Sequence, residues 1–204
     1  MSDPIRPGDA AGAETLEIMA AAPRYNAWQF EAIAPWIGRR VIEVGSGVGN
    51  MSAHILASPR EKVVLTDTDE WYRSELARQF ADRPEVRIDS LTLPDADAPA
   101  RFAAERLDTA VALNVVEHIE DDVGTLATLG GIVGRAGKVV ILVPAMDALY
   151  GTLDVELGHF RRYTRKRIQD TFDRAGLRVL HLEWFNRVGP LGWWFNARIR
   201  AARR

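Results

Sequence analysis

The stretch EVGSGVGN at residues 43–50 decides the fold of this 204-residue chain. It follows a short β-branched run, residues 41–44, that favours a strand, and a helical pattern begins at Asn50. Gly45 and Gly47 permit a sharp turn and let a ligand come close to the main chain. The helix that follows offers free N–H groups to a polar or anionic group. This order indicates a ligand site at the carboxyl end of a strand in an open α/β sheet.

Strand and helix patterns alternate along the rest of the chain. Apolar runs predict strands at residues 41–44, 63–66, 86–88, 109–113, 138–143 and 177–185. Helical spacing and end signals predict helices around residues 16–19, 28–36, 50–57, 70–80, 98–105, 121–133 and 164–175. Because most of the strands are almost wholly apolar, the sequence predicts a Rossmann-like, doubly wound and mostly parallel sheet with helices on both faces.

The composition is that of one globular domain over residues 1–204. Apolar residues make up 47% and charged residues 26%, and a net charge of −2 gives no field that attracts nucleic acid. The absence of cysteine excludes disulfides and thiolate metal sites and fits the cytoplasm. Residues 1–12 have the composition of a mobile end without a signal peptide, and no apolar run reaches the roughly 18 residues of a membrane span.

The last segment, residues 186–204, has an unusual charge pattern. It holds five arginines and no acid, and Trp193, Trp194 and Phe195 lie among them. Two interpretations stay open. The tryptophans pack on the domain with the arginines in solvent, or the segment seats in a membrane interface as a peripheral contact.

The glycine spacing argues against a dinucleotide ligand. A dinucleotide fingerprint places its third glycine at position 50, where this chain has Asn50, with glycine at Gly49 instead. The resulting Glu-x-Gly-x-Gly-x-Gly pattern resembles motif I of class I S-adenosylmethionine-dependent methyltransferases. In that family the turn carries the methionine end of the cofactor. The resemblance implies a set of cofactor-binding residues here: Glu43, Gly45, Ser46, Gly47 and Gly49.

Three further motifs of the same family follow in order. An acid after the second strand holds the cofactor ribose, which here implies Asp67 with Thr68 beside it, while Asp69 is read as a helix cap. A carboxylate suits this role because it accepts two hydrogen bonds from neighbouring hydroxyls. The resemblance also implies Asp89 and Ser90 near the adenine, and Asn114 beside the methionine portion. As alternatives, Asp67 serves only as a cap and Asp89 is a surface acid.

One feature of the family is missing from the sequence pattern. The family sheet normally gains a seventh, antiparallel strand from a final hairpin, and no convincing strand follows Phe185. The seventh strand is therefore doubtful.

The predicted acceptor site lies in the loops after the fourth and fifth strands. His118 and His159 are the candidate catalytic residues, and the long loop 145–163 is the candidate acceptor lid. The predicted substrate-binding residues are Tyr150, Arg161, Arg162 and Tyr163. As alternatives, His118 packs at a helix start, and the two arginines form a structural network with Asp154. The sequence predicts no metal site, and His54 and His181 are read as structural.

These residues predict methyl transfer to a small-molecule, glycan or lipid-linked acceptor, preferably at oxygen. Residues 151–163 and Trp193-Trp194 resemble a bacterial subgroup found beside or fused to glycosyltransferases. N-methylation and a non-catalytic binding module remain alternatives, and Asn50 disfavours a nicotinamide-dependent dehydrogenase. The Pro-Pro-aromatic motif of amino-methylating DNA enzymes is absent after Asn114, which argues against nucleic acid. The oligomeric state is not indicated.

Overall fold

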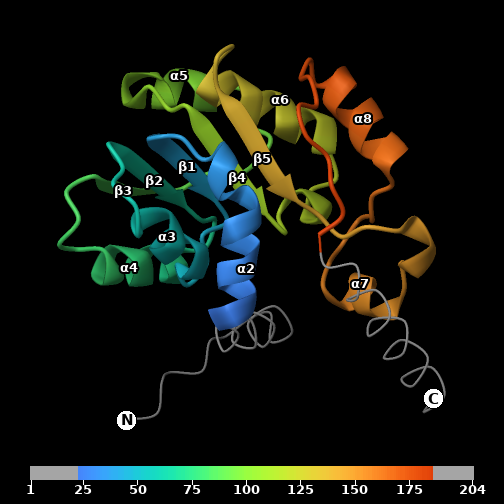
Figure 1. Cartoon of the computed structure of the whole chain (residues 1–204), viewed down its shortest axis with the longest axis horizontal. Coiled ribbons are helices and arrows are strands. Elements are labelled where there is room, and N and C mark those ends of the chain that lie inside the picture. The colour runs from blue at the N-terminus through green and yellow to red at the C-terminus, as the bar shows by residue number, and fades with distance from the viewer. Residues whose placement is uncertain (1–22, 186–204) are drawn as a thin grey trace, which may run out of the picture.

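The structure, a computed structural model, describes residues 23–185 and has three layers, with a sheet between two groups of helices (Figure 1). The strands are β1 (Arg40–Val44), β2 (Lys62–Thr66), β3 (Val86–Asp89), β4 (Thr109–Leu113) and β5 (Lys138–Leu142). Their order in the sheet is β3-β2-β1-β4-β5, and every neighbouring pair is parallel. The carboxyl ends of all the strands therefore meet at one edge, and the chain reverses its direction of winding between β1 and β4.

Helices cover both faces of the sheet because the strands are apolar on both sides. On one face lie α2 (Pro23–Ile33), α3 (Asn50–Leu56) and α4 (Glu70–Gln79), and on the other lie α5 (Ala98–Phe102), α6 (Asp122–Val133) and α8 (Arg165–Arg174). Successive strand residues enter different cores: Val41 packs with α3 and α4, whereas Ile42 packs with α5, α6 and α8. The predicted doubly wound, Rossmann-like fold is confirmed.

Three helices begin at a capping side chain, as predicted for Asp69. Asp69 caps α4 by accepting a hydrogen bond from the Trp71 N–H, and Asp121 caps α6 through the Gly124 N–H. Thr164 caps α8 through the N–H of Arg167. These side chains satisfy N–H groups that the first helical turn leaves unpaired.

The long loop after β5 is more ordered than its sequence indicates. It contains the 3₁₀ turn η4 (Asp147–Leu149) and the short helix α7 (Thr152–Glu156). A β-bridge joins Ala145 to Tyr163 and brings the two ends of the loop together. Three more 3₁₀ turns complete the described elements: η1 (Ala34–Trp36), η2 (Ala103–Glu105) and η3 (Val116–His118).

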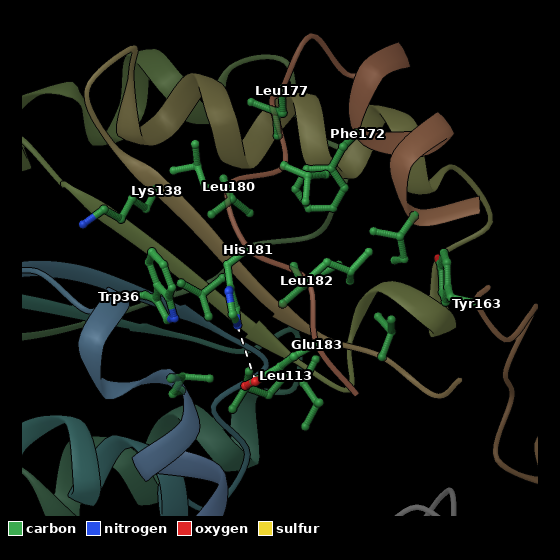
Figure 2. Close-up of a pocket in the computed structure, with 18 of the residues that line it drawn as sticks. Trp36, Leu113, Lys138, Tyr163, Phe172, Leu177, Leu180, His181, Leu182 and Glu183 are labelled. Atoms are coloured by element: carbon green, nitrogen blue, oxygen red, sulfur yellow. Dashed lines mark ion pairs between the residues drawn. The ribbon is translucent and has the colours of Figure 1, made fainter. Parts of the chain in front are cut away.

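The predicted sixth strand at residues 177–185 is wrong. This segment has no strand assignment, and β5 is the edge of the sheet within residues 23–185. A cavity of about 1040 Å³ lies between β5 and the segment (Figure 2). The apolar side chains of Leu177, Val179 and Leu182 pack on the core instead. These apolar side chains are thus partly buried by packing, although the backbone of the segment does not form the hydrogen-bond ladder of a strand.

Several sequence predictions lie outside the described residues. They are the mobile end at 1–12, the helix around 16–19, and both interpretations of residues 186–204, including the seventh strand. Within the described part of the chain, no helix has the length and apolar character needed to cross a bilayer.

Candidate functional site

The glycine turn between β1 and α3 has the backbone geometry that its sequence requires. Gly45, Gly47 and Gly49 have φ values of 68°, 52° and 81°, which side chains with a Cβ disfavour. A Cβ on Gly45 would also lie only 2.7 Å from Cγ2 of Val115. The Ser46 N–H donates to the Thr66 carbonyl at 2.9 Å, which ties the turn to the end of β2. The glycines therefore leave the main chain of the turn uncovered by side chains of their own, at the carboxyl edge of the sheet.

Asp67 lies directly beside this turn, at the end of β2. Asp67 is 9% exposed, and its Oδ2 accepts a hydrogen bond from the Gly47 N–H at 3.0 Å. The other oxygen, Oδ1, accepts from the Asp69 N–H at 3.0 Å. The structure thus brings the glycine turn and Asp67, two parts of the predicted cofactor site, into direct contact. Asp69 serves as the helix cap.

Glu43, in β1, is a buried acid that links the strand before the glycine turn to the helix after it. It is 4% exposed, and its Oε2 accepts a hydrogen bond from the Ser52 hydroxyl at 2.5 Å. Burial, with a smaller contribution from the negative charge of Asp67, raises the pKa of Glu43 to about 7. The carboxyl group is therefore protonated in the folded protein at mildly acidic pH.

We expect Glu43→Gln to remove a pH dependence of stability. The pKa of Glu43 rises from 4.5 to about 7 on folding, so the native state holds a proton that the unfolded state loses in this window. The free energy of unfolding of the native sequence should fall by about 2 to 3 kcal/mol more than that of Glu43→Gln between those pH values. Urea unfolding from pH 4.5 to 8 measures the difference. Parallel curves for the two proteins would show that Glu43 titrates alike in both states.

The residues predicted near the adenine lie at the end of β3 and form contacts with other protein groups. Asp89 is half-buried and forms an ion pair with Arg87, which also pairs with Glu105 at 2.7 Å. Ser90 is exposed, and its N–H donates to Oδ1 of Asp89 at 2.8 Å. Thr68, predicted near the ribose, is exposed beside Asp67. The structure places these residues along the same edge as the turn, and their roles stay predictions.

Asn114 follows β4 at the same edge. It is exposed and has a φ of 54°, and its N–H donates to the Leu142 carbonyl at 2.8 Å. Asn tolerates this left-handed conformation better than most residues, and such strain is concentrated at functional sites. Its position next to β1 and the glycine turn agrees with the predicted cofactor role.

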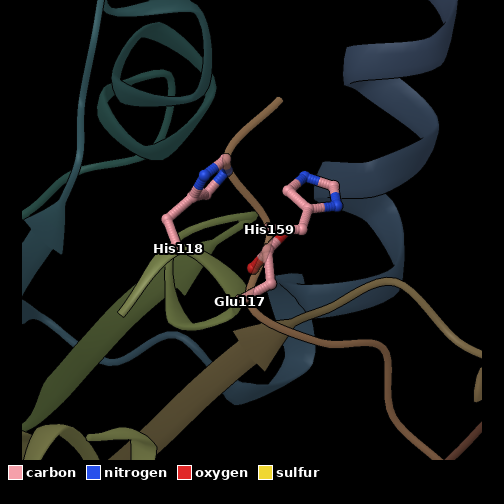
Figure 3. Close-up of side chains that lie close together, drawn as sticks. All are labelled: Glu117, His118 and His159. Atoms are coloured by element: carbon pink, nitrogen blue, oxygen red, sulfur yellow. The ribbon is translucent and has the colours of Figure 1, made fainter. Parts of the chain in front are cut away.

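The two candidate catalytic histidines lie together beyond the ends of β4 and β5 (Figure 3). The rings of His118 and His159 meet edge to face, with centroids 4.7 Å apart. Glu117 adjoins them, and one ligand atom from each of the three residues lies within 4.8 Å of the others. Glu117 is 1% exposed, and burial raises its pKa to about 8. The sequence predicts both histidines at the acceptor site, and the structure adds the buried acid Glu117.

Asp154 organises the loop that carries His159. It is fully buried, and its Oδ1 lies 2.9 Å from Nδ1 of His159 and accepts from Nε of Arg162 at 2.8 Å. Its Oδ2 accepts from the Gly151 N–H at 3.0 Å. Burial opposes its charge most strongly, but these donors outweigh burial and hold the pKa of Asp154 below its usual value. Asp154 is therefore a charged anchor that fixes the His159 ring.

The predicted substrate-binding residues are engaged with protein groups. Arg162 is 6% exposed in its pair with Asp154. Arg161 donates to the Ile119 carbonyl at 2.9 Å and lies 3.2 Å from the Asp122 carboxylate. These contacts favour the structural alternative for both arginines, so direct substrate contact remains a prediction for them.

The two tyrosines of the set differ in their exposure. The hydroxyl of Tyr163, which is 2% exposed, donates to Asp122 at 3.2 Å, and burial raises its pKa. Tyr150 is 42% exposed, and its hydroxyl donates to the His159 carbonyl at 2.7 Å. Of the two, Tyr150 is the more exposed to solvent, and its hydrogen bond ties it to the histidine loop.

Glu117 and the anchoring contact of Asp154 are the features that the sequence did not single out. The Glu-His pair at 117–118, four residues after the end of β4, is a usable signal, since it places a carboxylate beside an imidazole at the ligand edge. The cavity along β5 reaches this site at Asn114, Arg162 and Tyr163, and its lining includes none of Glu117, His118 and His159. The polar cluster therefore lies outside this cavity.

The comparisons with known proteins agree with this geometry. A family profile described as a methyltransferase domain matches residues 15–182. A search among curated proteins gave no match. Among solved structures, an O-methyltransferase family protein from Burkholderia thailandensis has a TM-score of 0.63 at 18% identity, covering 81% of this chain and 55% of that chain.

Two further solved structures share the fold. The CurJ carbon methyltransferase has a TM-score of 0.60 at 18% identity, over 77% of this chain and 46% of that one. The trans-methyltransferase CalH, solved in complex with SAH, has a TM-score of 0.56 at 19% identity, over 68% and 44%. This chain spans about half the length of these proteins. At such identities the likeness shows the fold alone, and the profile, which covers most of the sequence, carries the assignment. The chain belongs to the methyltransferase-domain family, and its cofactor is S-adenosylmethionine.

Proposed function

We propose that this protein transfers the methyl group of S-adenosylmethionine to an oxygen of a small-molecule, glycan or lipid-linked acceptor. One observation carries the proposal. The glycine turn with Asp67 and the cluster of Glu117, His118 and His159 lie at the carboxyl ends of neighbouring strands in one sheet. A donor held on the first and an acceptor held on the second would meet at this edge.

The residues of the first crossover would hold the cofactor. The open main chain of residues 45–49 would receive its amino-acid end, and the Asp67 carboxylate would accept hydrogen bonds from its ribose hydroxyls. Asn114 would border the methionine portion, with Asp89 and Ser90 toward the adenine. When bound, S-adenosylmethionine supplies an electrophilic methyl group on a sulfonium.

The acceptor side would position a hydroxyl and help it to lose its proton. Nδ1 of His159 is held by the charged Asp154 carboxylate, which leaves Nε2 as the ring atom that faces other groups. In the transfer, the acceptor O–H bond would break with its proton passing to Nε2 of His159, the oxygen would form a bond to the methyl carbon, and the carbon–sulfur electron pair would stay on sulfur. Assistance with the proton is worth roughly 10²- to 10⁴-fold in rate. A hydroxyl acceptor therefore makes the best use of the histidine pair.

Three features of this proposal rest on the sequence alone. They are the binding of an acidic substrate group by Arg161 and Arg162, a peripheral membrane contact, and a lipid-linked acceptor. The similar structures include an O-methyltransferase family protein and a carbon methyltransferase, so the preference for oxygen rests on the histidine pair.

Isothermal titration of the full chain with S-adenosylmethionine and with NAD tests the donor. We expect binding of the sulfonium ligand alone, and tight binding of NAD without it would overturn the proposal. A panel of phenol, sugar hydroxyl, carboxylate and amine acceptors, read by formation of S-adenosylhomocysteine, tests the transfer. Turnover with hydroxyl acceptors supports it. Binding without turnover on every acceptor would favour the non-catalytic alternative, and turnover with amines only would favour N-methylation.

A further inference from the structure

A cluster with the composition of a metal site lies at the carboxyl end of β4. It consists of Glu117 and His118 at η3 and His159 after α7, and one ligand atom from each lies within 4.8 Å of the other two. Ligands about 2.1 Å from a tetrahedral ion lie roughly 3.4 Å from one another. Figure 3 shows the three side chains grouped together, and His118 is the exposed member of the group.

The buried carboxylate is a second, independent observation. Glu117 is 1% exposed, and within the described residues its Oε2 has no hydrogen-bond partner although it is shielded from solvent. Burying a carboxylate oxygen without a partner is costly, and buried acids are usually paired with cations or coordinate metals. The backbone of the same residue is fixed, since its carbonyl accepts from the Phe160 N–H at 2.8 Å. The carboxylate is thus held in place beside the histidines with unused capacity to bind.

The support around His159 has the form found at metal sites. Nδ1 of the ring is paired with the buried Asp154 carboxylate at 2.9 Å, and Asp154 is itself held by Arg162. Histidine ligands in proteins usually donate their second N–H to a carboxylate in this way, which orients the ring and makes the other nitrogen a better donor. The side chain of His159 is 9% exposed, so its orientation is restricted by the loop around it.

We propose that Glu117, His118 and His159 bind a divalent transition-metal ion, best matched by Zn²⁺, and keep at least one coordination position open for the acceptor oxygen. Two imidazoles and one carboxylate form a ligand set of catalytic zinc sites, in which the fourth position is left to water or substrate. This inference rests on the proposed function and names the means by which the acceptor is prepared.

The chemistry is balanced without any further reagent. An acceptor hydroxyl bound to the cation becomes more acidic and gives up its proton to water, as water does at catalytic zinc. The oxygen then takes the methyl carbon, and the sulfonium sulfur keeps the electron pair of the broken bond. In this arrangement His159 acts as a ligand, and the role of Asp154 is to orient it.

Zinc binding by the untagged full chain tests the proposal directly. After treatment with a chelator, the protein is titrated calorimetrically with ZnCl₂, and Co²⁺ is used as a spectroscopic probe of imidazole ligation. We expect one ion per chain, and visible Co²⁺ absorption bands of a four- or five-coordinate site. His118→Ala and His159→Ala should each weaken Zn²⁺ binding by about 10- to 100-fold or more.

Matched histidine deletions serve as controls. His54 stacks on Phe30 and His181 on Trp36, away from the cluster. His54→Ala and His181→Ala should bind Zn²⁺ as the native sequence does. His118 is exposed, so its alanine variant should fold, and thermal unfolding of every variant checks this.

Two results would overturn the metal site. One is equal Zn²⁺ binding by the native chain and by the triple variant Glu117→Gln/His118→Ala/His159→Ala. The other is equal losses in the His54 and His181 variants. Titration with S-adenosylmethionine in the same metal-free samples separates the two proposals. Intact cofactor binding with no Zn²⁺ binding rejects only the metal site, whereas absent cofactor binding rejects the proposed function.

Discussion

Asp67→Ala is expected to weaken S-adenosylmethionine binding by about 100- to 1000-fold, because the ribose loses a carboxylate acceptor for two hydroxyls. Hydrogen bonds to a charged group are worth roughly 1.5 to 3 kcal/mol each. The substitution also frees the Gly47 N–H, which Asp67 holds at 3.0 Å, and so loosens the turn. Calorimetric titration of the variant with S-adenosylmethionine measures the loss.

Asp69→Ala is the matched control for this variant. Asp69 lies two residues away and caps α4 through the Trp71 N–H at 2.8 Å. Its loss should cost about 1 kcal/mol of stability and leave cofactor affinity within a few-fold of the native value. Unchanged affinity in Asp67→Ala, or an equal loss in Asp69→Ala, would show that Asp67 does not bind the ribose.

His159→Ala is expected to lower kcat by about 100- to 1000-fold with little change in cofactor affinity. The imidazole lies in the acceptor half of the site and is oriented by Asp154, whereas the cofactor half is built from β1, β2 and β3. Turnover is measured with the best acceptor of the panel, and the affinity for S-adenosylmethionine is measured on the same protein.

His181→Ala provides the comparison here, since it also removes one imidazole. His181 is half exposed, and its Nε2 lies 3.5 Å from Glu183. This variant should keep native turnover. Full activity in His159→Ala would remove His159 from the reaction, and an equal loss in both variants would point to a general effect on the fold.

The central sheet could be predicted because each of its strands is indicated by the residues of that strand and of the turns beside it. β1, β2 and β4 are apolar runs bounded by turn signals, and glycine at 45, 47 and 49 marks the first crossover. Cap residues such as Asp121 announce their helices in the same local way. Features specified by a few neighbouring residues are therefore recovered from the pattern alone.

Residues 177–185 show where pattern stops being sufficient. Alternating apolar side chains predict a half-buried extended segment, and Leu177 and Val179 do pack on the core. Whether such a segment joins a sheet depends on a backbone partner, and β5 lies across a cavity from it. Strand pairing is a long-range property, so the periodicity of one segment does not determine it.

The acceptor side could be predicted only in part. The sequence placed His118 and His159 in neighbouring loops, but the burial of Glu117 depends on the loop 145–163 folding over it. The arginines beside His159 show the same limit, because a fork of donors suits a substrate acid and a protein carboxylate equally well. Only the fold shows that Arg162 is held by Asp154.

A crystal structure of the chain with S-adenosylhomocysteine tests the central claim most directly. The account predicts the amino-acid end of the ligand against the main chain of residues 45–49, and both ribose hydroxyls within hydrogen-bond distance of the Asp67 carboxylate. A ligand bound elsewhere, or a glycine turn closed by side chains with Asp67 turned away from the sugar, would contradict it.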